Sequence, residues 1–174
     1  YPAAFLAADM GFQVTVFERE DNPGGVCLYR GCIPSKALLH VARVIEESRE
    51  ASQWGLTYAD PQINLDKMRA WKNAVITKLT GGLGSLTKAR NIRYVKGHAS
   101  FKNSQTLAIE GKGGASTEWT FDYCVVATGS RPVIPAPLAI QSERVMDSTG
   151  ALDIKDIPGR LLVIGGGYIG CELG

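Results

Sequence analysis

The sequence is short of the features that mark several special classes of protein. It has only four cysteines in 174 residues, too few and too unevenly spaced for the disulfide framework of a small secreted protein. No apolar run approaches the roughly 20 residues that a membrane-spanning helix needs, and the first residues lack the charged region of a signal peptide. An excess of one charge is also lacking, because 19 basic residues are balanced by 17 acidic ones. We therefore expect a cytoplasmic protein with no membrane partner and no nucleic-acid partner.

Length and composition are those of ordinary globular protein. Hydrophobic residues make up 45% of the chain and charged residues 21%, which is typical of a folded domain. A chain of 174 residues holds one good core, or one domain and part of another. The chain starts at Tyr1 rather than at a methionine and ends within a glycine-rich motif, so we interpret it as a fragment of a longer protein.

Two of the cysteines lie close together in the segment GGVCLYRGCIPSK, residues 24–36. Four residues separate Cys27 from Cys32. In a regular helix this spacing places them at least ~7.5 Å apart along the axis, whereas a disulfide joins Cα atoms roughly 4.4–6.8 Å apart. A bridged pair therefore needs a break in the helix, which Gly31 can supply.

The residues after the second cysteine predict a helix that begins at that point. Pro34 suits a first helical turn, so Cys32 would lie at a helix N-terminus. There the backbone N–H groups and the helix dipole favour a thiolate, and Lys36 adds positive charge one turn further on. The chemistry predicted for this segment is therefore that of a reactive thiol.

A bare pair of cysteines at this spacing does not by itself indicate a redox centre. Such a pair is more often a structural disulfide, or two unrelated core cysteines. A metal-binding module using Cys27, Cys32 and Cys124 would need a second closely spaced pair of ligands, and the sequence has none. We expect no metal.

Hydrophobic periodicity predicts an α/β chain. Helices are expected over residues 1–10, 37–51 and 64–89, with Asn64 as the cap of the last. Strands are expected over residues 13–17, 92–101, 106–110, 118–121, 123–127 and 160–164. Of these, 92–121 form a small antiparallel meander with Gly111, Gly113 and Gly114 in its turn, whereas 13–17 and 123–127 belong to a buried parallel sheet.

The helix expected over residues 64–89 has two further features. Its apolar stripe is expected to lie in the core or in an interface, and comprises Leu65, Met68, Trp71, Val75, Leu79, Leu83 and Leu86. Gly81, Gly82 and Gly84 would each weaken an isolated helix by about 1 kcal/mol. We therefore expect close backbone packing at these glycines.

An acidic residue follows the first predicted strand. Glu18 stands at the carboxyl end of residues 13–17, where dinucleotide-binding βαβ units place a carboxylate against the adenosine ribose. Without other signals, a carboxylate at a strand end is more commonly just a solvated side chain.

A glycine-rich motif follows the last predicted strand. Gly165, Gly167 and Gly170 form G-x-G-x-x-G directly after residues 160–164, which is the context that the dinucleotide fingerprint requires. The motif alone is a weak signal, and the acidic residue that separates NAD from NADP lies beyond the sequence.

These motifs together resemble the flavoprotein pyridine nucleotide–disulfide oxidoreductases. The cysteine motif is followed at the expected distance by the turn ATGSRP, residues 127–132, and then by the second glycine motif. The variant CIPSKALLHVA, residues 32–42, is most similar to the dihydrolipoamide dehydrogenase branch of this family. Tyr29 departs from the pattern, since the family usually has asparagine there, which puts the local packing beside the cysteines in question.

The resemblance covers nearly the whole chain and implies a fold. Residues 1–145 would form a Rossmann-like FAD-binding domain, with a parallel sheet and a small antiparallel meander but without its first strand. Residues 146–174 would begin a second Rossmann-like domain that binds NAD.

The resemblance also implies roles for particular residues. Cys27 and Cys32 would form a redox-active disulfide, with Cys27 exchanging with substrate and Cys32 facing the flavin. Lys36 would stabilise the reduced flavin and pair with Glu172. The implied cofactor contacts are Glu18, Gly25, Lys36, Ala99, Thr128, Gly129 and Ser130 for FAD, and Gly165, Gly167, Tyr168, Gly170 and Glu172 for NAD.

The implied function is transfer of electrons from dihydrolipoyl groups, through the disulfide and FAD, to NAD. The donor would be a lipoyl-bearing protein or a small dithiol, and the whole protein would be a homodimer and a possible component of 2-oxoacid dehydrogenase complexes. Because the catalytic histidine of the family lies in a C-terminal domain of the partner subunit, this fragment alone is expected to be inactive. The alternatives are a sibling NAD(P)H-dependent enzyme, such as a mercuric or glutathione reductase, and a non-catalytic FAD-binding scaffold with a structural disulfide.

Overall fold

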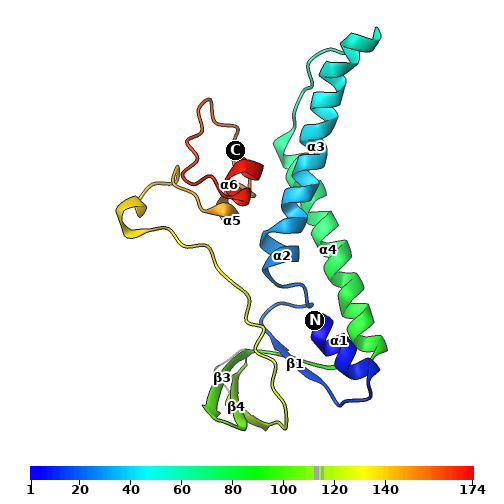
Figure 1. Ribbon diagram of the computed structural model, residues 1–174, viewed down its shortest axis with the longest axis vertical. Coiled ribbons are helices and arrows are strands. Elements are labelled where there is room, and N and C mark those ends of the chain that lie inside the picture. Colours follow the sequence, from blue (N-terminus) through cyan, green and yellow to red (C-terminus); the bar gives the residue numbers. More distant parts are fainter. Residues whose placement is uncertain (112–113, 115) are drawn as a thin grey trace. The chain divides into compact units, whose positions relative to one another are not determined.

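The structure is a computed structural model that describes residues 1–111, 114 and 116–174 (Figure 1). The chain divides into two compact units. Unit 1 comprises residues 1–24 and 79–129, and unit 2 comprises residues 25–78 and 130–174. No helix in the described ranges has the length and apolar character required to cross a bilayer.

Unit 1 contains all the strands of the described residues. Its elements are α1 (Pro2–Asp9), β1 (Thr15–Glu18), the last turns of α4 (Leu65–Ala89), β2 (Arg93–Lys96), β3 (His98–Asn103), β4 (Thr106–Glu110) and β5 (Ser116–Thr120). β1 and β2 form a parallel pair in which Glu18 lies opposite Lys96, and β3, β4 and β5 form an antiparallel meander with β4 in the centre. This is the α/β arrangement, with a parallel sheet and a meander, that the sequence predicts.

The core of unit 1 lies under the meander. Leu107 and Ile109 of β4 are buried, at alternate positions of the strand, so both point to one face of the sheet. On β5, Trp119 packs edge-on against Phe17 of β1, with ring centroids 5.4 Å apart. The guanidinium of Arg93 lies 4.3 Å from the centre of the same indole ring. These contacts join the meander to the parallel pair.

Unit 2 is helical. Its elements are α2 (Gly25–Arg30), α3 (Cys32–Glu50), the 3₁₀ turn Ala51–Trp54, the first turns of α4, the 3₁₀ turn Ala136–Leu138, α5 (Ser148–Ala151) and α6 (Tyr168–Leu173). The predicted cap of α4 is confirmed, since the side chain of Asn64 accepts a hydrogen bond from the backbone N–H of Lys67 at 2.9 Å. The rings of His40 on α3 and Trp71 on α4 lie 6.2 Å apart, where the two helices run side by side (Figure 1).

Buried contacts join α4 to the segment that precedes the glycine-rich motif. Lys72 is only 5% exposed, and its ammonium donates a hydrogen bond of 2.7 Å to the carbonyl of Leu152. Arg69 donates one of 2.6 Å to the carbonyl of Ile154. Burial lowers the pKa of Lys72, the nearby Arg69 lowers it further, and Asp153 partly offsets both.

The strand predicted over residues 92–101 is two strands. The chain is interrupted at Gly97, and its first half, β2, joins the parallel pair rather than the meander. A Cβ at position 97 would lie 2.7 Å from a side-chain methyl of Ile109 and 2.8 Å from the carbonyl oxygen of Glu110. Only glycine permits this close crossing. The alternation of apolar and polar residues continues through Gly97, so the sequence pattern does not reveal the break.

The last strand of the meander is also shifted from the predicted 118–121 to Ser116–Thr120. Gly113 of the predicted turn lies outside the described residues.

Two further predicted strands, 123–127 and 160–164, are not strands in the structure. Within unit 1 the described parallel sheet consists of β1 and β2 alone, and residues 123–127 pair with neither. The described part of unit 2 contains no strand that could pair with residues 160–164. A strand forms where a neighbouring strand supplies hydrogen-bond partners, and among the described residues neither segment has such a neighbour. The prediction that 123–127 is buried is wrong because Tyr123 and Val125 are exposed.

The apolar stripe of α4 is less buried than its sequence predicts. Trp71, Leu79 and Leu86 are each more than 40% exposed. The buried positions of the helix include the polar residues Lys72, Thr80 and Thr87. Of the three glycines, only Gly84 is closely packed, since a Cβ there would meet the side chain of Asn22, whereas Gly81 and Gly82 have open space around them.

Candidate active site

The predicted cysteines lie on either side of a break between two helices of unit 2. Cys27 belongs to α2, and Cys32 is the first residue of α3. Between them Gly31 caps α3 with φ −140° and ψ −107°, so the helix does not continue through the pair. A Cβ on Gly31 would lie 3.2 Å from the carbonyl oxygen of Val26. The break at Gly31 and the helix start at Cys32 are both confirmed.

Both cysteines are free thiols in the structure, and they are unequal. Cys27 is half-buried, whereas Cys32 is exposed. A hydrogen bond with the side chain of Cys32 raises the pKa of the Cys27 thiol, burial and the charge of Cys32 raise it further, and the ammonium of Lys36 lowers it slightly. Cys32 thus lies near enough to Cys27 to raise its pKa, while the disulfide itself stays a prediction.

The first turns of α3 carry a buried and an exposed polar residue side by side. Lys36 is exposed, four positions after Cys32. Ser35 is only 6% exposed, and its hydroxyl donates a hydrogen bond to a carboxylate oxygen of Glu172 on α6. The predicted pairing of Lys36 with Glu172 is not among the ion pairs of the described ranges, and stays a prediction.

The contact from Ser35 is the functional feature that sequence reasoning missed. Ser35 lies inside the motif CIPSK, so its place in the motif was a signal that could have pointed to it. Its side chain has no distinctive chemistry, and nothing in the sequence shows that it is buried against a residue 137 positions away.

The second glycine motif forms a turn and the start of a helix. Gly167 caps α6, whose first residue is Tyr168, 80% exposed. A Cβ on Gly170 would lie only 2.2 Å from the carbonyl oxygen of Gly165, so no larger residue fits at this crossing. Binding of a dinucleotide at this turn stays a prediction.

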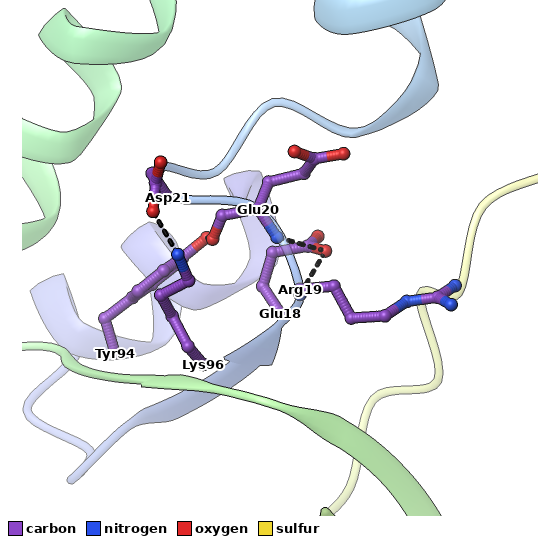
Figure 2. Close-up of polar contacts among 6 residues, drawn as sticks. All are labelled: Glu18, Arg19, Glu20, Asp21, Tyr94 and Lys96. Carbon is purple, nitrogen blue, oxygen red and sulfur yellow. Dashed lines mark hydrogen bonds and ion pairs between the residues drawn. The ribbon is translucent and has the colours of Figure 1, made fainter. Parts of the chain in front are cut away.

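In unit 1, Glu18 is the last residue of β1, at the carboxyl end of the parallel pair (Figure 2). One of its carboxylate oxygens accepts hydrogen bonds from the backbone N–H groups of Arg19, at 2.7 Å, and of Glu20, at 3.4 Å. The other oxygen takes part in neither bond, and can accept from a ribose hydroxyl.

The loop after Glu18 is held by β2. The ammonium of Lys96 pairs with Asp21, and the hydroxyl of Tyr94 donates to the carbonyl of Glu20 at 3.2 Å (Figure 2). The loop that follows Glu18 is therefore fixed from the neighbouring strand.

The other predicted FAD contacts lie on exposed backbone. Ala99 is exposed on β3, opposite Ile109. Thr128 and Ser130 are exposed, and Gly129 between them has φ +73°, which a residue with a side chain rarely adopts. The predicted residues divide between the units. Glu18, Ala99, Thr128 and Gly129 belong to unit 1, and Cys27, Cys32, Gly25, Lys36, Ser130, Gly165, Gly167, Tyr168, Gly170 and Glu172 belong to unit 2.

One cavity lies apart from all these residues. It has a volume of about 340 Å³ and is lined by Arg69, Lys72, Asn73, Asp153 and Lys155. Its two innermost cations already donate to backbone carbonyls. Across the part of the chain that the structure describes, no three His, Cys, Asp or Glu side chains are grouped as metal ligands.

Comparisons with known proteins cover the whole chain. The sequence model of the family described as "Pyridine nucleotide-disulphide oxidoreductase" matches residues 1–174. The dihydrolipoyl dehydrogenase of Haemophilus influenzae is 48% identical over 174 residues, which are 100% of this chain and 36% of that protein. The dihydrolipoyl dehydrogenase of Vibrio cholerae is 46% identical over 99% of this chain and 36% of its own length, and that of Bacillus subtilis 45% over 100% and 36%. The chain thus spans about a third of the length of these curated relatives.

Proposed function

Since this chain belongs to the pyridine nucleotide-disulphide oxidoreductases, we propose that it is the part of a dihydrolipoyl dehydrogenase that carries the redox-active thiol pair. The whole protein would oxidise a dihydrolipoyl dithiol to its disulfide and reduce NAD to NADH, with release of one proton. The proposed domain boundary, between residues 145 and 146, separates the FAD-binding part from the beginning of the NAD-binding part.

The observation that carries the proposal is the contact between Cys27 and Cys32 across the helix break. Cys32 is the main cause of the raised pKa of Cys27, so the two thiols lie close enough to interact across the break at Gly31. Cys32 stands at the first position of a helix of 19 residues, where the N-terminal dipole favours a thiolate. The two thiols are therefore suited to different tasks, one exchanging with substrate and the other bearing charge.

The residues present fit an FAD. Glu18 has a free carboxylate oxygen at the carboxyl end of a parallel pair, where a ribose is expected, and Gly129 allows the backbone to approach a bound group. We propose Glu18, Gly25, Lys36, Ala99, Thr128, Gly129 and Ser130 as FAD contacts. When bound, FAD supplies a two-electron relay between the thiol pair and NAD.

The glycine-rich turn before α6 is the part of this chain that we propose for binding NAD. The backbone at Gly170 passes so close to Gly165 that only glycine fits there, as the third glycine of the fingerprint requires. We propose Gly165, Gly167, Tyr168, Gly170 and Glu172 as the residues of this chain that contact NAD.

In the proposed mechanism the side chains of this chain move protons and hold charge. A substrate thiolate attacks the sulfur of Cys27 in the oxidised enzyme, which breaks the Cys27–Cys32 bond and leaves Cys32 as a thiolate. The second substrate thiol then displaces Cys27, which takes up a proton and leaves the substrate as a disulfide. Lys36, one helical turn from Cys32, stabilises the negative charge.

The partners and the cellular location are part of the proposal. Lipoyl-bearing proteins and small dithiols are the proposed substrates, a 2-oxoacid dehydrogenase complex is the proposed assembly, and a homodimer is the proposed state of the whole protein. A cytoplasmic location is supported by the small number of cysteines and by a function that needs reducible thiols.

The test is an anaerobic experiment on the complete protein. Dihydrolipoamide should bleach the flavin absorbance and produce NADH when NAD is added. Rapid oxidation of NADPH with glutathione disulfide or mercuric ion as acceptor, and no bleaching by dihydrolipoamide, would identify a sibling reductase instead. A flavin that no dithiol or nicotinamide cofactor reduces would identify a non-catalytic scaffold.

A further inference from the structure

The proposed mechanism leaves one buried polar contact without a role. Ser35 lies between Pro34, which is fully buried, and Lys36, which is exposed. Its hydroxyl, itself almost inaccessible, donates to the carboxylate of Glu172, and both residues belong to unit 2. Glu172 lies on α6, two residues after the last glycine of the nucleotide motif. We propose that Ser35 is a positioning residue, which holds Glu172 of the nicotinamide-binding turn against the helix that begins with Cys32.

The chemistry of the contact suits this role. A hydroxyl that donates to a carboxylate forms a charge-assisted hydrogen bond, which is shorter and stronger than a neutral one. The bond lies at the first turn of α3, where unpaired backbone N–H groups and the helix dipole favour a negative charge. A buried hydroxyl without an acceptor is costly, so the serine and the glutamate each need the other.

Geometry along α3 indicates what the contact controls. Ser35 is three positions after Cys32 and one before Lys36. A carboxylate bonded to Ser35 is held at the first turn of the helix that carries both the thiol proposed to bear charge and Lys36. The contact therefore couples the position of the nucleotide turn to the redox helix. For its effect on catalysis this inference depends on the proposed function, whereas the contact itself does not.

The experiment compares four forms of the complete protein: wild type, Ser35→Ala, Ser35→Thr and Ser48→Ala. Threonine keeps the hydroxyl. Ser48 is the matched control, because it lies on the same helix and its hydroxyl donates to the carbonyl of Ile45 at 2.7 Å rather than to α6. Amide hydrogen exchange over residues 168–173 is measured first, since it reports local opening without any turnover.

We expect Ser35→Ala to speed exchange over residues 168–173 by roughly 10- to 100-fold, the equivalent of a lost hydrogen bond to a charged group. Exchange in Ser35→Thr and Ser48→Ala should stay close to wild type. If Ser35→Ala leaves this exchange unchanged, or speeds it equally throughout α3, the serine only packs the helix and the inference is overturned. Glu172→Ala tests the same bond from the other side: the double variant with Ser35→Ala should exchange no faster than Glu172→Ala alone, and additive effects would also overturn it.

A kinetic readout tests the role in catalysis. In rapid mixing, reduction of the flavin by NADH should slow about tenfold in Ser35→Ala, the lower end of the same estimate, while reduction by dihydrolipoamide changes little. An equal loss in both steps would overturn the positioning role. If wild type is reduced by neither reagent, the proposed function fails, and the exchange result still decides whether the contact exists.

Discussion

Two motif-bearing segments of unit 2 differ in how much structure they form. The cysteine segment, residues 25–50, is helical except at the break before Cys32, and it buries Pro34, Ser35 and Ala37. The glycine-rich segment, residues 160–174, forms only the short helix α6, and Leu162 is 83% exposed. Both motifs are visible in the sequence.

The difference follows from where each segment finds its hydrogen bonds. In a helix, every backbone bond is made within the segment itself, and the break in the cysteine segment needs only Gly31. A strand takes its bonds from a neighbouring strand, and the described part of unit 2 has none. The glycine-rich segment and the linker before it (residues 150–158) are held instead by side chains of α3 and α4, namely Ser35, Arg69 and Lys72.

The largest expected effect comes from removing one thiol of the cysteine segment. In the complete protein, replacing Cys27 or Cys32 by serine should lower dihydrolipoamide turnover by at least roughly 10³-fold, as loss of a nucleophile does, because a hydroxyl forms no disulfide. Steady-state turnover and bound flavin are measured together. Cys124→Ser is the matched control, since Cys124 is an exposed thiol in unit 1, and turnover surviving in either serine variant would remove the thiol pair from the mechanism.

The next effect should loosen the linker while sparing the cysteine segment. Lys72→Met keeps the aliphatic stem but leaves the buried carbonyl of Leu152 without its donor, at a cost of about 1–3 kcal/mol in local opening free energy. Amide exchange over residues 150–158 should therefore quicken, and exchange over residues 32–50 should not. The control is Lys67→Met, on the exposed side of the same helix. Uniform quickening in both segments would show that they are not held independently.

The pH dependence of this contact has a definite sign. Burial lowers the pKa of Lys72 in the folded state, so below the ordinary lysine value of about 10.4 the unfolded chain binds more protons. The stability of the linker contact should rise with pH through the window between the lowered pKa and that value. The rise should vanish in Lys72→Met, and a wild-type curve that falls through the window would contradict the assigned burial.

The same distinction between local and distant partners explains how far sequence reasoning reached. The helix start at Cys32, the break at Gly31 and the cap at Asn64 follow from residues within one turn, and all were predicted. The strands over residues 123–127 and 160–164 failed because alternation and β-branching describe a suitable strand but supply no partner for it.

The side that α4 buries, and the Ser35–Glu172 contact, could not be obtained from sequence for a related reason. Lys72 and Ser35 are polar residues whose burial depends on acceptors 80 and 137 positions away. No local periodicity encodes such a partner. Predicted FAD and NAD contacts such as Glu18 and Gly170 were placed by motif, and they stay predictions.

A smaller effect should come from charge within the cysteine segment. Lys36→Met removes the cation one turn from Cys32 and should shift the two-electron potential of the bound flavin downward by about 30 mV, equivalent to ~1.4 kcal/mol. The reason is that a cation there stabilises states that carry negative charge. A redox titration that also follows the long-wavelength absorbance of the thiolate–flavin pair provides the measurement, with Lys67→Met as the control. Equal potentials in wild type and Lys36→Met would make the lysine a surface residue.

The smallest effect concerns the order in which the two thiols react. In the reduced, cofactor-free protein, iodoacetamide should label Cys32 before Cys27, because Cys32 is exposed and the hydrogen bond with Cys32 raises the pKa of Cys27. With FAD bound we expect the reverse, since the proposed flavin covers Cys32 and access limits its rate. Mass spectrometry of the two peptides, with and without FAD, measures the order.

A pH series sharpens the same test. Because the pKa of Cys27 is raised in the folded state, its protonated form stabilises the fold fully below the unfolded value. That contribution is lost as the pH rises through the pKa of Cys27 in the folded state.

Labelling of Cys27 should therefore begin at higher pH than labelling of an ordinary thiol. Cys32→Ser should move this onset, because it replaces the thiol that forms the hydrogen bond. One pKa unit corresponds to about a tenfold change in thiolate below the midpoint, so the displacement is measurable even when the order of labelling is not. An order that FAD does not change, with an onset that Cys32→Ser does not move, would show that the two cysteines are chemically equivalent and that the helix break does not differentiate them.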